Sequence, residues 1–225
     1  MSTLLPAAVL VLSLAHANQA QQERNVTAFK AVSVSGGFEL KVHRGSPQKV
    51  VIRADQDVIE KVETKVVDGE LRIALNGWHM HTGHLEAEVT TPDLIGIEGS
   101  GGTKVSGDGP KGKDCKIEGT GGTEIDLKGV ACEGLKLEVS GGANVKLSGA
   151  AKKLAMDASG GVDLDTESLQ VADAKLEASG GVSGTMAVTE TIDSDFSGGV
   201  TLKIKGHPRV KKMSASGGAS TQFED

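Results

Sequence analysis

Three pairs of polar residues, spaced nineteen to twenty positions apart, are the strongest candidates for chemistry in this sequence. They are Glu124 with Asp126, Asn144 with Lys146, and Asp163 with Asp165. Carboxylates beside an amine are the groups that bind Ca²⁺ or perform acid–base catalysis in enzymes that cleave polysaccharides. The set has no aromatic side chains on which sugars would stack. A solvated surface is therefore the interpretation that we favour over a catalytic patch.

Three of the six histidines stand beside the only Trp, in the run Trp78-His79-Met80-His81-Thr82-Gly83-His84. On a strand His79 and His81 would share one face, and His84 would return from a turn, a set that Zn²⁺ or Cu²⁺ accepts. A His-rich surface loop without metal is the alternative. No acidic or Cys ligand stands beside the cluster, so we predict no metal site. We assign no catalytic or cofactor-binding residue and expect no cofactor.

Cys115 and Cys132 are the two cysteines of the chain. An oxidising compartment permits a disulfide between them. Inward-facing thiols that act as small apolar side chains are the other possibility. The sequence leaves both open.

The elements that would position these residues follow from a triplet that recurs in the second half of the chain. Its first residues are Ser100, Thr120, Ser140, Ser159, Ser179, Ser197 and Ser216, each followed by Gly-Gly. The nearly constant interval, roughly 20 residues, indicates one structural unit that is repeated by stacking. Phe, Trp and Tyr make up 2% of the residues, so the expected core is thin and aliphatic.

Apolar residues alternate with polar ones on both sides of each Gly-Gly, and a period of two indicates strands. Glycine accepts the backbone of a sharp corner, and strands in units of constant length pair in parallel with the next unit. We therefore predict an all-β fold, a single right-handed parallel β-helix with about 20 residues per coil. Within residues 26–93 we expect irregular first coils that cap the open end, and within 94–225 regular coils.

An acidic residue stands two positions before the triplet in six repeats: Glu98, Glu118, Glu138, Asp157, Glu177 and Asp195. Lysines two positions further back, at Lys116, Lys136, Lys175 and Lys212, would offset the repulsion between stacked carboxylates. We interpret this face as a solvated surface of mixed charge. A row of cation sites is the alternative.

The first residues predict export. Leu4 to Leu14 form an apolar run too short to span a bilayer, and Ala15-His16-Ala17 suits signal peptidase. We therefore expect a signal peptide over 1–17, with Ala20 as a second choice for cleavage, and a mature domain over 18–225. That domain would be periplasmic, on the outer surface or extracellular, without a stable membrane span. The net charge of −6 and the lack of a basic block argue against nucleic acid as a partner.

The run from Phe29 to Val42, which contains Ser35-Gly36-Gly37, resembles the start of a bacterial exported family named head GIN domain, or putative auto-transporter adhesin. Further matches run from Val66 to Ile73 and from Val89 to Leu94, and the Ser-Gly-Gly repeats complete the resemblance over nearly all of the mature chain. The resemblance implies a secreted or cell-surface β-helix with an adhesive role. It implies no catalytic residues.

We therefore expect a non-enzymatic exported module that binds a protein or glycan through its flat outer sheets. A polysaccharide lyase or hydrolase that uses the acidic patch is one alternative. Self-association end to end is the other, because the last repeat has no recognisable cap. Near it only Glu224 and Asp225 discourage edge pairing.

Overall fold

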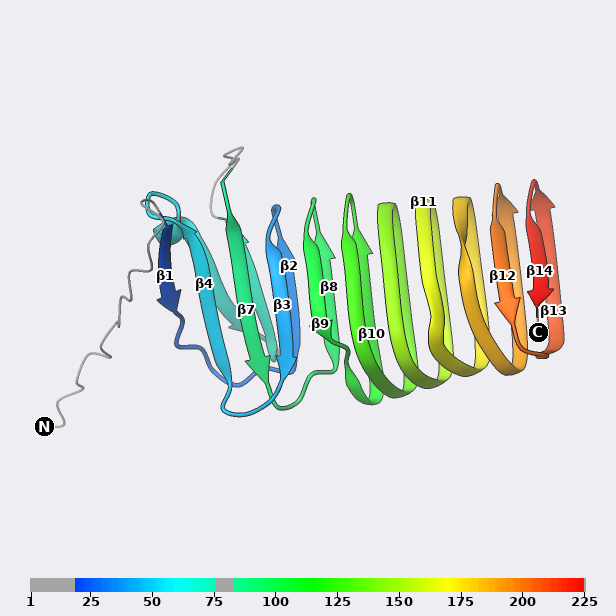
Figure 1. The fold of residues 1–225 in the computed structure, drawn as a ribbon, viewed down its shortest axis with the longest axis horizontal. Helices are drawn as coiled ribbons and strands as arrows, with labels where there is room; N and C mark the ends of the chain where they lie inside the picture. Colours follow the sequence, from blue (N-terminus) through cyan, green and yellow to red (C-terminus); the bar gives the residue numbers. More distant parts are fainter. Residues whose placement is uncertain (1–18, 76–82, 225) are drawn as a thin grey trace, which may run out of the picture.

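The computed structural model describes residues 19–75 and 83–224, which form an elongated, almost entirely β structure (Figure 1). One short 3₁₀ turn, η1, spans Ile59–Lys61. In the described part of the chain, no helix is long and apolar enough to cross a membrane.

Fourteen strands of the described residues join into one hydrogen-bonded sheet. The strands are β1 (Gln19–Glu23), β2 (Ala31–Ser35), β3 (Glu39–Arg44), β4 (Lys49–Asp55), β5 (Val62–Val67), β6 (Glu70–Leu75), β7 (Leu85–Thr91), β8 (Gly96–Ser100), β9 (Lys104–Asp108), β10 (Lys111–Thr120), β11 (Glu124–Gly198), β12 (Thr201–Lys205), β13 (Arg209–Gly217) and β14 (Ser220–Glu224). These strands make up most of the described residues, which confirms the predicted all-β class. Most of the strand pairs are parallel.

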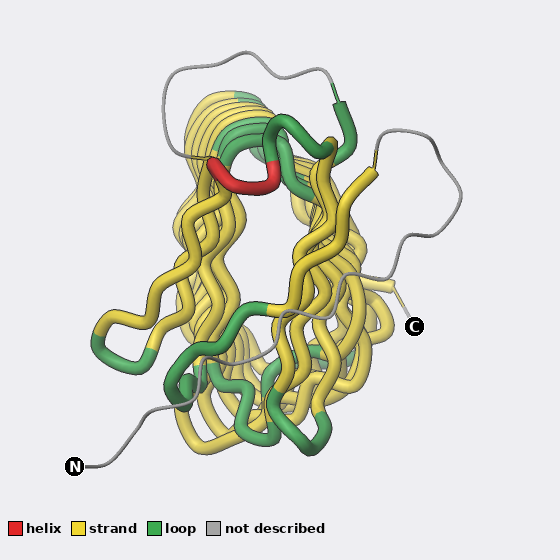
Figure 2. Tube along the Cα trace, turned by 90° about the vertical axis from the view of Figure 1, so that its left-hand side faces the viewer, coloured by secondary structure: helices red, strands yellow, loops and turns green. Residues whose placement is uncertain are grey.

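The repeats pair in register at the spacing of the triplets. Ile97 of β8 lies beside Ile117 of β10, which lies beside Leu137 of β11. Near the C-terminus the offset between β11 and β13 is 18 at Ile192 and Val210 and, after a register shift, 19 at Phe196 and Ala215. Viewed along the long axis, the traces of successive repeats overlie one another (Figure 2). Equal spacing therefore aligns the same repeat position from one strand to the next.

The N-terminal region departs from this parallel pattern. Strand β4 pairs antiparallel with both β1 and β7, and β5 pairs antiparallel with β6. The β5–β6 turn is formed by Asp68 and Gly69, with φ values of 53° and 78°. Two consecutive positive φ values are typical of a two-residue hairpin, and a hairpin reverses the strand direction. Strictly parallel pairing is therefore wrong for this region.

The triplet at Ser35 lies directly beside the triplet at Ser100, although 65 positions separate them. Strand β2 has β8 on one side and β6 on the other, and β3 likewise lies between β9 and β7. The intervening segments therefore lie on the far side of the Ser35 repeat, toward the N-terminal end. They do not form three further repeats between the two triplets.

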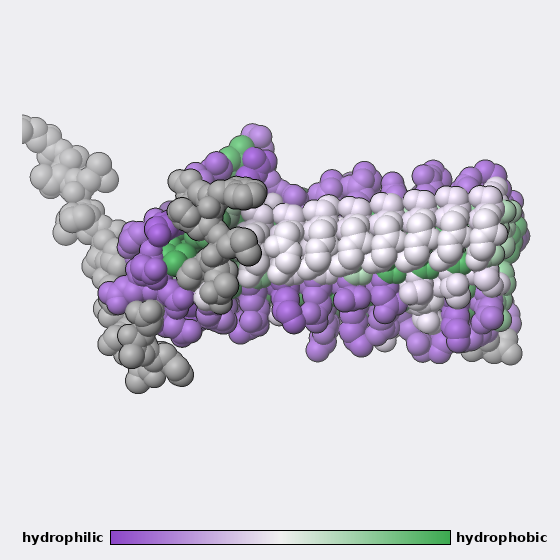
Figure 3. Space-filling view, turned by 90° about the horizontal axis from the view of Figure 1, so that it is seen from above, coloured by the Kyte–Doolittle hydropathy of each residue, from purple (hydrophilic) through white to green (hydrophobic). Residues whose placement is uncertain are grey.

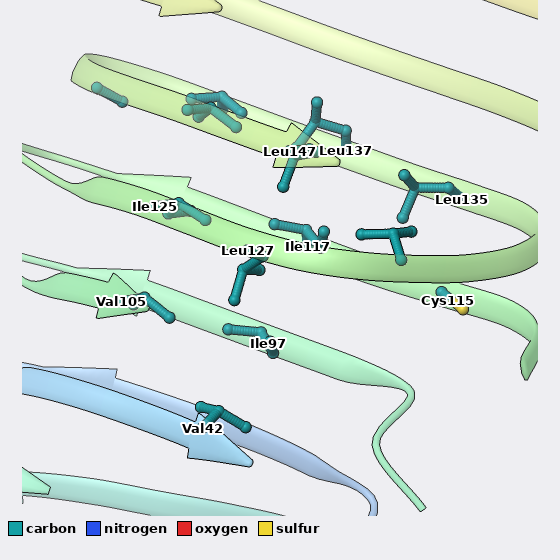
Figure 4. Close-up of a cluster of buried hydrophobic side chains, with 14 of the residues drawn as sticks. Val42, Ile97, Val105, Cys115, Ile117, Ile125, Leu127, Leu135, Leu137 and Leu147 are labelled. Atoms are coloured by element: carbon teal, nitrogen blue, oxygen red, sulfur yellow. The ribbon is translucent and has the colours of Figure 1, made fainter. Parts of the chain in front are cut away.

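The core is a continuous column of aliphatic side chains between the facing strands (Figure 4). Leu137, Ile117 and Ile97 follow one another at one repeat position, and Ile125 and Val105 at another. The rings of Phe38 and Phe196 are fully buried. Each strand places alternate side chains in this column, which explains the period of two in the sequence.

The Gly-Gly corners stack into a nearly side-chain-free stripe along one edge of the molecule (Figure 3). A Cβ atom on Gly160 would lie 2.8 Å from the carbonyl oxygen of Gly141, and one on Gly180 would lie 3.0 Å from that of Gly160. Both residues also have positive φ, which L side chains rarely adopt. The corner therefore requires glycine for two separate reasons.

Candidate binding surface

The six polar residues of the predicted acidic patch do come together. They surround a hollow of about 170 Å³ on the outer face formed by β9 and the following repeats: Glu124, Asp126, Asn144, Lys146, Asp163 and Asp165. Each pair follows a Gly-Gly corner at the same repeat position, so parallel pairing places the pairs side by side. The sequence therefore predicted this arrangement correctly.

Lysines hold two of these carboxylates. Lys146 Nζ lies 2.8 Å from Asp165 Oδ2, and Lys104 Nζ lies 2.8 Å from Glu124 Oε2. The hydrogen bond to Asp165 and that carboxylate's charge raise the pKa of Lys146. The hollow is also smaller than the roughly 300–1,000 Å³ of typical ligand pockets. The patch is a shallow surface of paired charges.

Of the three histidines in the predicted cluster, His84 lies within the described residues. His84 Nε2 lies 3.2 Å from Glu86 Oε2, while His79 and His81 lie outside the described residues. Within 19–75 and 83–224, no three His, Cys, Asp or Glu side chains converge as metal ligands. His84 belongs instead to an ion-pair network on β4 and β7.

Glu86 is the centre of that network. Arg53 Nη1 lies 2.6 Å from Glu86, its Nη2 lies 2.9 Å from Glu88, and Lys41 Nζ lies 3.5 Å from Glu86. Partial burial alone would raise the pKa of Glu86. The hydrogen bond from His84 and the charges of Lys41 and Arg53 outweigh it and lower that pKa. Arg53 also donates to Gln21, which ties β1 to the sheet.

The predicted mixed-charge face is confirmed on β8, β10 and the first part of β11. Glu98, Glu118 and Glu138 are register neighbours. Lys116 Nζ lies 2.7 Å from Glu118 and 3.0 Å from Glu138, and Lys136 Nζ lies 2.8 Å from Glu138. Hydrogen bonds from Lys136 and then Lys116 lower the pKa of Glu138 to about 2. The Glu138 carboxylate is therefore held as an ion between two lysines.

A larger hollow, here called the charged groove, was not predicted. It encloses about 570 Å³ beside the bends opposite the glycine stripe, and its lining combines small, apolar and charged residues: Asp114, Cys115, Gly134, Leu135, Lys136, Lys153, Leu154, Ala155, Asp173, Ala174, Lys175, Thr191, Asp193 and Lys211. Gly134 and Ala155 stand at outward positions where other repeats carry Lys, Asp or Thr. The small residues at these two outward positions were the one sign in the sequence that the surface could be hollowed there.

A second hollow of about 650 Å³, here called the alanine groove, lies along the neighbouring stretch of the same bends. Ala131, Ala150 and Ala172 line it, with Lys111, Glu133 and Lys152 around them. Cys132 lines this groove and Cys115 the charged groove, and the two form a disulfide with an S–S distance of 2.07 Å. Both cysteines are buried, and of the two possibilities left open by the sequence the structure shows the disulfide.

Comparison with known proteins shows the family to which this chain belongs. The family model described as "Putative auto-transporter adhesin, head GIN domain" matches residues 28–208. No curated protein sequence matches the chain.

Solved structures share the fold at low sequence identity. A protein described as a putative adhesin from Bacteroides fragilis is 20% identical with a TM-score of 0.85, and the match covers 92% of this chain and 97% of that one. A putative lipid binding protein from Parabacteroides distasonis is 12% identical, with a TM-score of 0.71 and coverages of 93% and 98%. A putative adhesin from Parabacteroides merdae is 15% identical, with a TM-score of 0.65 and coverages of 93% and 97%. At these identities the likeness concerns the fold alone.

Proposed function

Because the chain belongs to the family described as "Putative auto-transporter adhesin, head GIN domain", we propose that it is an exported, non-enzymatic module that binds a partner at a cell surface. The charged groove is the observation that carries this proposal. It is the size of a ligand site, and it crosses successive repeats rather than lying within one. An extended partner suits such a groove.

We further infer that the strands wind as a right-handed parallel β-helix with about 20 residues per coil. Register offsets of 20 between β8 and β10, of 20 between β10 and β11 and of 18 to 19 between β11 and β13 support this winding. Six coils contribute to the groove, with one residue of each at Asp114, Gly134, Lys153, Asp173, Thr191 and Lys211. Five steps of about 4.8 Å give a groove roughly 24 Å long.

The charges of the groove favour a polypeptide as the partner. Four lysines (Lys136, Lys153, Lys175, Lys211) face three aspartates (Asp114, Asp173, Asp193) along the same groove. Of these, Lys153 and Lys211 form no ion pair within the described residues. A groove with both signs of charge suits a chain that also carries both, and the lack of sugar-stacking aromatic rings disfavours a neutral glycan.

The test is a screen of the mature protein against a displayed peptide library and a glycan array. We expect enrichment of extended peptides, and at least about tenfold weaker binding of the selected peptide by the Lys153→Glu, Lys211→Glu variant. Lys65→Glu, an exposed reversal on the β5–β6 hairpin, is the control and should bind normally. Peptide binding that the double variant retains would remove the groove from the proposal, and glycan binding alone would replace the partner class.

A polysaccharide lyase or hydrolase has weaker support, because the acidic patch is small and lysines pair with two of its four carboxylates. Incubation with acidic and neutral polysaccharides tests it directly. Cleavage by the wild type that is lost in Asp163→Ala, Asp165→Ala would establish the enzyme and overturn the proposed function.

We propose export through a signal over residues 1–17. Strand β1 begins at Gln19, and Gln19 and Ala20 pair with Asp55 and Ala54 of β4. Cleavage after Ala17 keeps these pairs, whereas cleavage after Ala20 would remove two of the five. Intact-mass measurement of the exported protein tests the choice, and a mature chain that begins at Gln21 would contradict it.

A further inference from the structure

The last repeat leaves its large apolar side chains uncovered. Val210 and Met213 of β13 and Phe223 of β14 are 44%, 38% and 46% exposed. Among the described residues, Ile95 is the one other large apolar side chain with comparable exposure, at 38%. Apolar surface therefore gathers at the C-terminal end, where Figure 3 shows it in green beyond the glycine stripe.

These three side chains continue the core of the preceding repeat. Val210 pairs with Ile192, Met213 with Ser194, and Phe223 with Ile204. The three partners are 0%, 1% and 0% exposed. Residues at the same repeat position point the same way, so Val210, Met213 and Phe223 lie on the core columns. Their exposure shows that this layer of the core lacks a cover.

The backbone of the same repeat is also open. In the part of the chain that the structure describes, β13 pairs with β11 alone and β14 with β12 alone. Each strand therefore has a second edge whose N–H and C=O groups can accept another strand. Since β13 and β14 run in opposite directions (Figure 1), two strands that pair antiparallel with these two edges also run in opposite directions.

Within the described residues, the N-terminal end does not offer a matching surface. There β4 carries the polar strand β1, of sequence QAQQE, and the η1 turn buries Val58 and Ile59. Head-to-tail stacking would set the uncovered core layer against this polar strand. The C-terminal end is matched best by a surface that is equally apolar and has equally open edges, namely the same end of another molecule.

We propose that the C-terminal end docks on the C-terminal end of a second copy of this chain, around a two-fold axis parallel to the strands. This axis sets β13 of each copy beside β14 of the other, in antiparallel directions. The contact uses the same surface on both copies, so it closes as a dimer and does not propagate into a fibre.

Charge selects this axis over one that sets β13 beside its own copy. Strand β13 carries Arg209, Lys211 and Lys212, whereas β14 carries Glu224. Arg209 and Lys211 form no ion pair among the described residues, while Lys212 lies 3.7 Å from Asp195 and Glu224 lies 3.2 Å from Lys203. Two β13 strands side by side would gather six cations along one seam. The chosen axis places cations beside Glu224 instead.

The positions of the apolar residues agree with the same axis. Met213 stands four residues before Gly217 (217 − 213), and Phe223 stands five residues after Gly218 (223 − 218). The two side chains therefore lie at similar distances from the glycine corner. The two-fold axis keeps both corners at one edge, so Met213 of each copy meets Phe223 of the other. Aromatic anchors in a desolvated centre supply much of the binding energy of interfaces.

Sedimentation analysis of the mature protein over a wide micromolar range tests the dimer. We expect a monomer–dimer equilibrium, with a dissociation constant that Phe223→Lys raises at least about tenfold. Ile95→Lys introduces the same charge at an equally exposed apolar position outside this end and should leave the equilibrium unchanged. Circular dichroism checks that both variants fold. A monomer at all concentrations, or a growing series of larger species, would overturn the proposal.

Disulfide trapping tests the axis. Chains with Met213→Cys are mixed with chains that carry Phe223→Cys, and oxidation is followed on non-reducing gels. The mixture should cross-link faster than either variant alone, because the axis brings residue 213 of one copy to residue 223 of the other. Faster cross-linking of Met213→Cys with itself would show that β13 meets β13, and the proposed arrangement would be wrong.

Discussion

The N-terminal strands β1 to β7 and the repeats from β8 onward bury their cores by different means. Among the repeats, each strand lies in parallel register on the one before, and buried positions recur at the spacing of the triplets. In the N-terminal region the antiparallel strands β1, β4 and β5 add to the sheet, and a network around Arg53 and Glu86 binds them together. A repeat buries only the face that meets its neighbour, so a stack of repeats always leaves its last layer open. Closing an end requires residues that break the repeat, and the N-terminal region has them.

The largest expected difference in unfolding free energy is between two kinds of glycine. One kind packs against the backbone of the neighbouring repeat, and the other is needed only for its positive φ. A Cβ on Gly149 would lie 2.2 Å from the carbonyl oxygen of Val130, at φ 129°. Gly37 in the N-terminal region has φ 77° but open space around it. In urea denaturation we expect Gly149→Ala to lower the free energy of unfolding by about 3–5 kcal/mol. Gly37→Ala should cost about 1–2 kcal/mol. Equal costs would show that contact between neighbouring repeats does not select the glycine.

Removal of the disulfide should weaken the repeats and spare the N-terminal region. The bridge joins β10 to β11 across a sequence separation of 17. The Cys115→Ala, Cys132→Ala variant should lose about 2–4 kcal/mol of unfolding free energy, because the unfolded chain regains freedom. Hydrogen exchange should show the lost protection around residues 111–136. An equal loss of protection in β4 and β7 would mean that the two regions unfold as one unit.

The Arg53 network should matter more than an exposed ion pair of the same chemistry. Arg53 bonds two glutamates and Gln21, and Glu86 is only 12% exposed. We expect Arg53→Met to cost about 1–2 kcal/mol in thermal or urea unfolding, because it removes hydrogen bonds to partly buried carboxylates. Arg72→Met breaks the exposed Arg72–Glu70 pair and should leave the unfolding free energy nearly unchanged, because water screens that pair. Similar losses in both variants would contradict a special role for the network.

The smallest effect is a pH dependence that belongs to the repeats. Lys136 and Lys116 lower the pKa of Glu138 from 4.5 to about 2. The unfolded chain therefore binds this proton more readily, so the stability that Glu138 adds is present above pH 4.5 and is lost as the pH falls toward 2. Acid unfolding of Glu138→Gln should show a shallower dependence than the wild type in that range. Glu23→Gln, at an exposed carboxylate of β1, is the control. An identical change in the acid unfolding of both variants would argue against Lys116 and Lys136 as the cause.

Regular spacing explains how much of the surface was predictable. Units of equal length stack position on position, so Glu124, Asn144 and Asp163 became neighbours as expected, and Glu118 and Glu138 likewise. The charged groove was not predictable in this way, because it depends on how the backbone curves near the bends as well as on the small size of Gly134 and Ala155. Alternation reports which face a residue occupies, but it does not report whether that face is hollow.

The amino-acid order by itself determined the all-β class, the parallel register of the repeats and the glycine corners. A two-residue period and a constant spacing leave few other ways to bury the aliphatic positions. Only the tertiary structure decided that Ser35 lies beside Ser100, that β4 and β5 run antiparallel, and that Cys115 meets Cys132. Those contacts join residues whose separations in the sequence follow no period. They depend on the geometry of the turns and on which of several strands pairs with a given edge of the sheet.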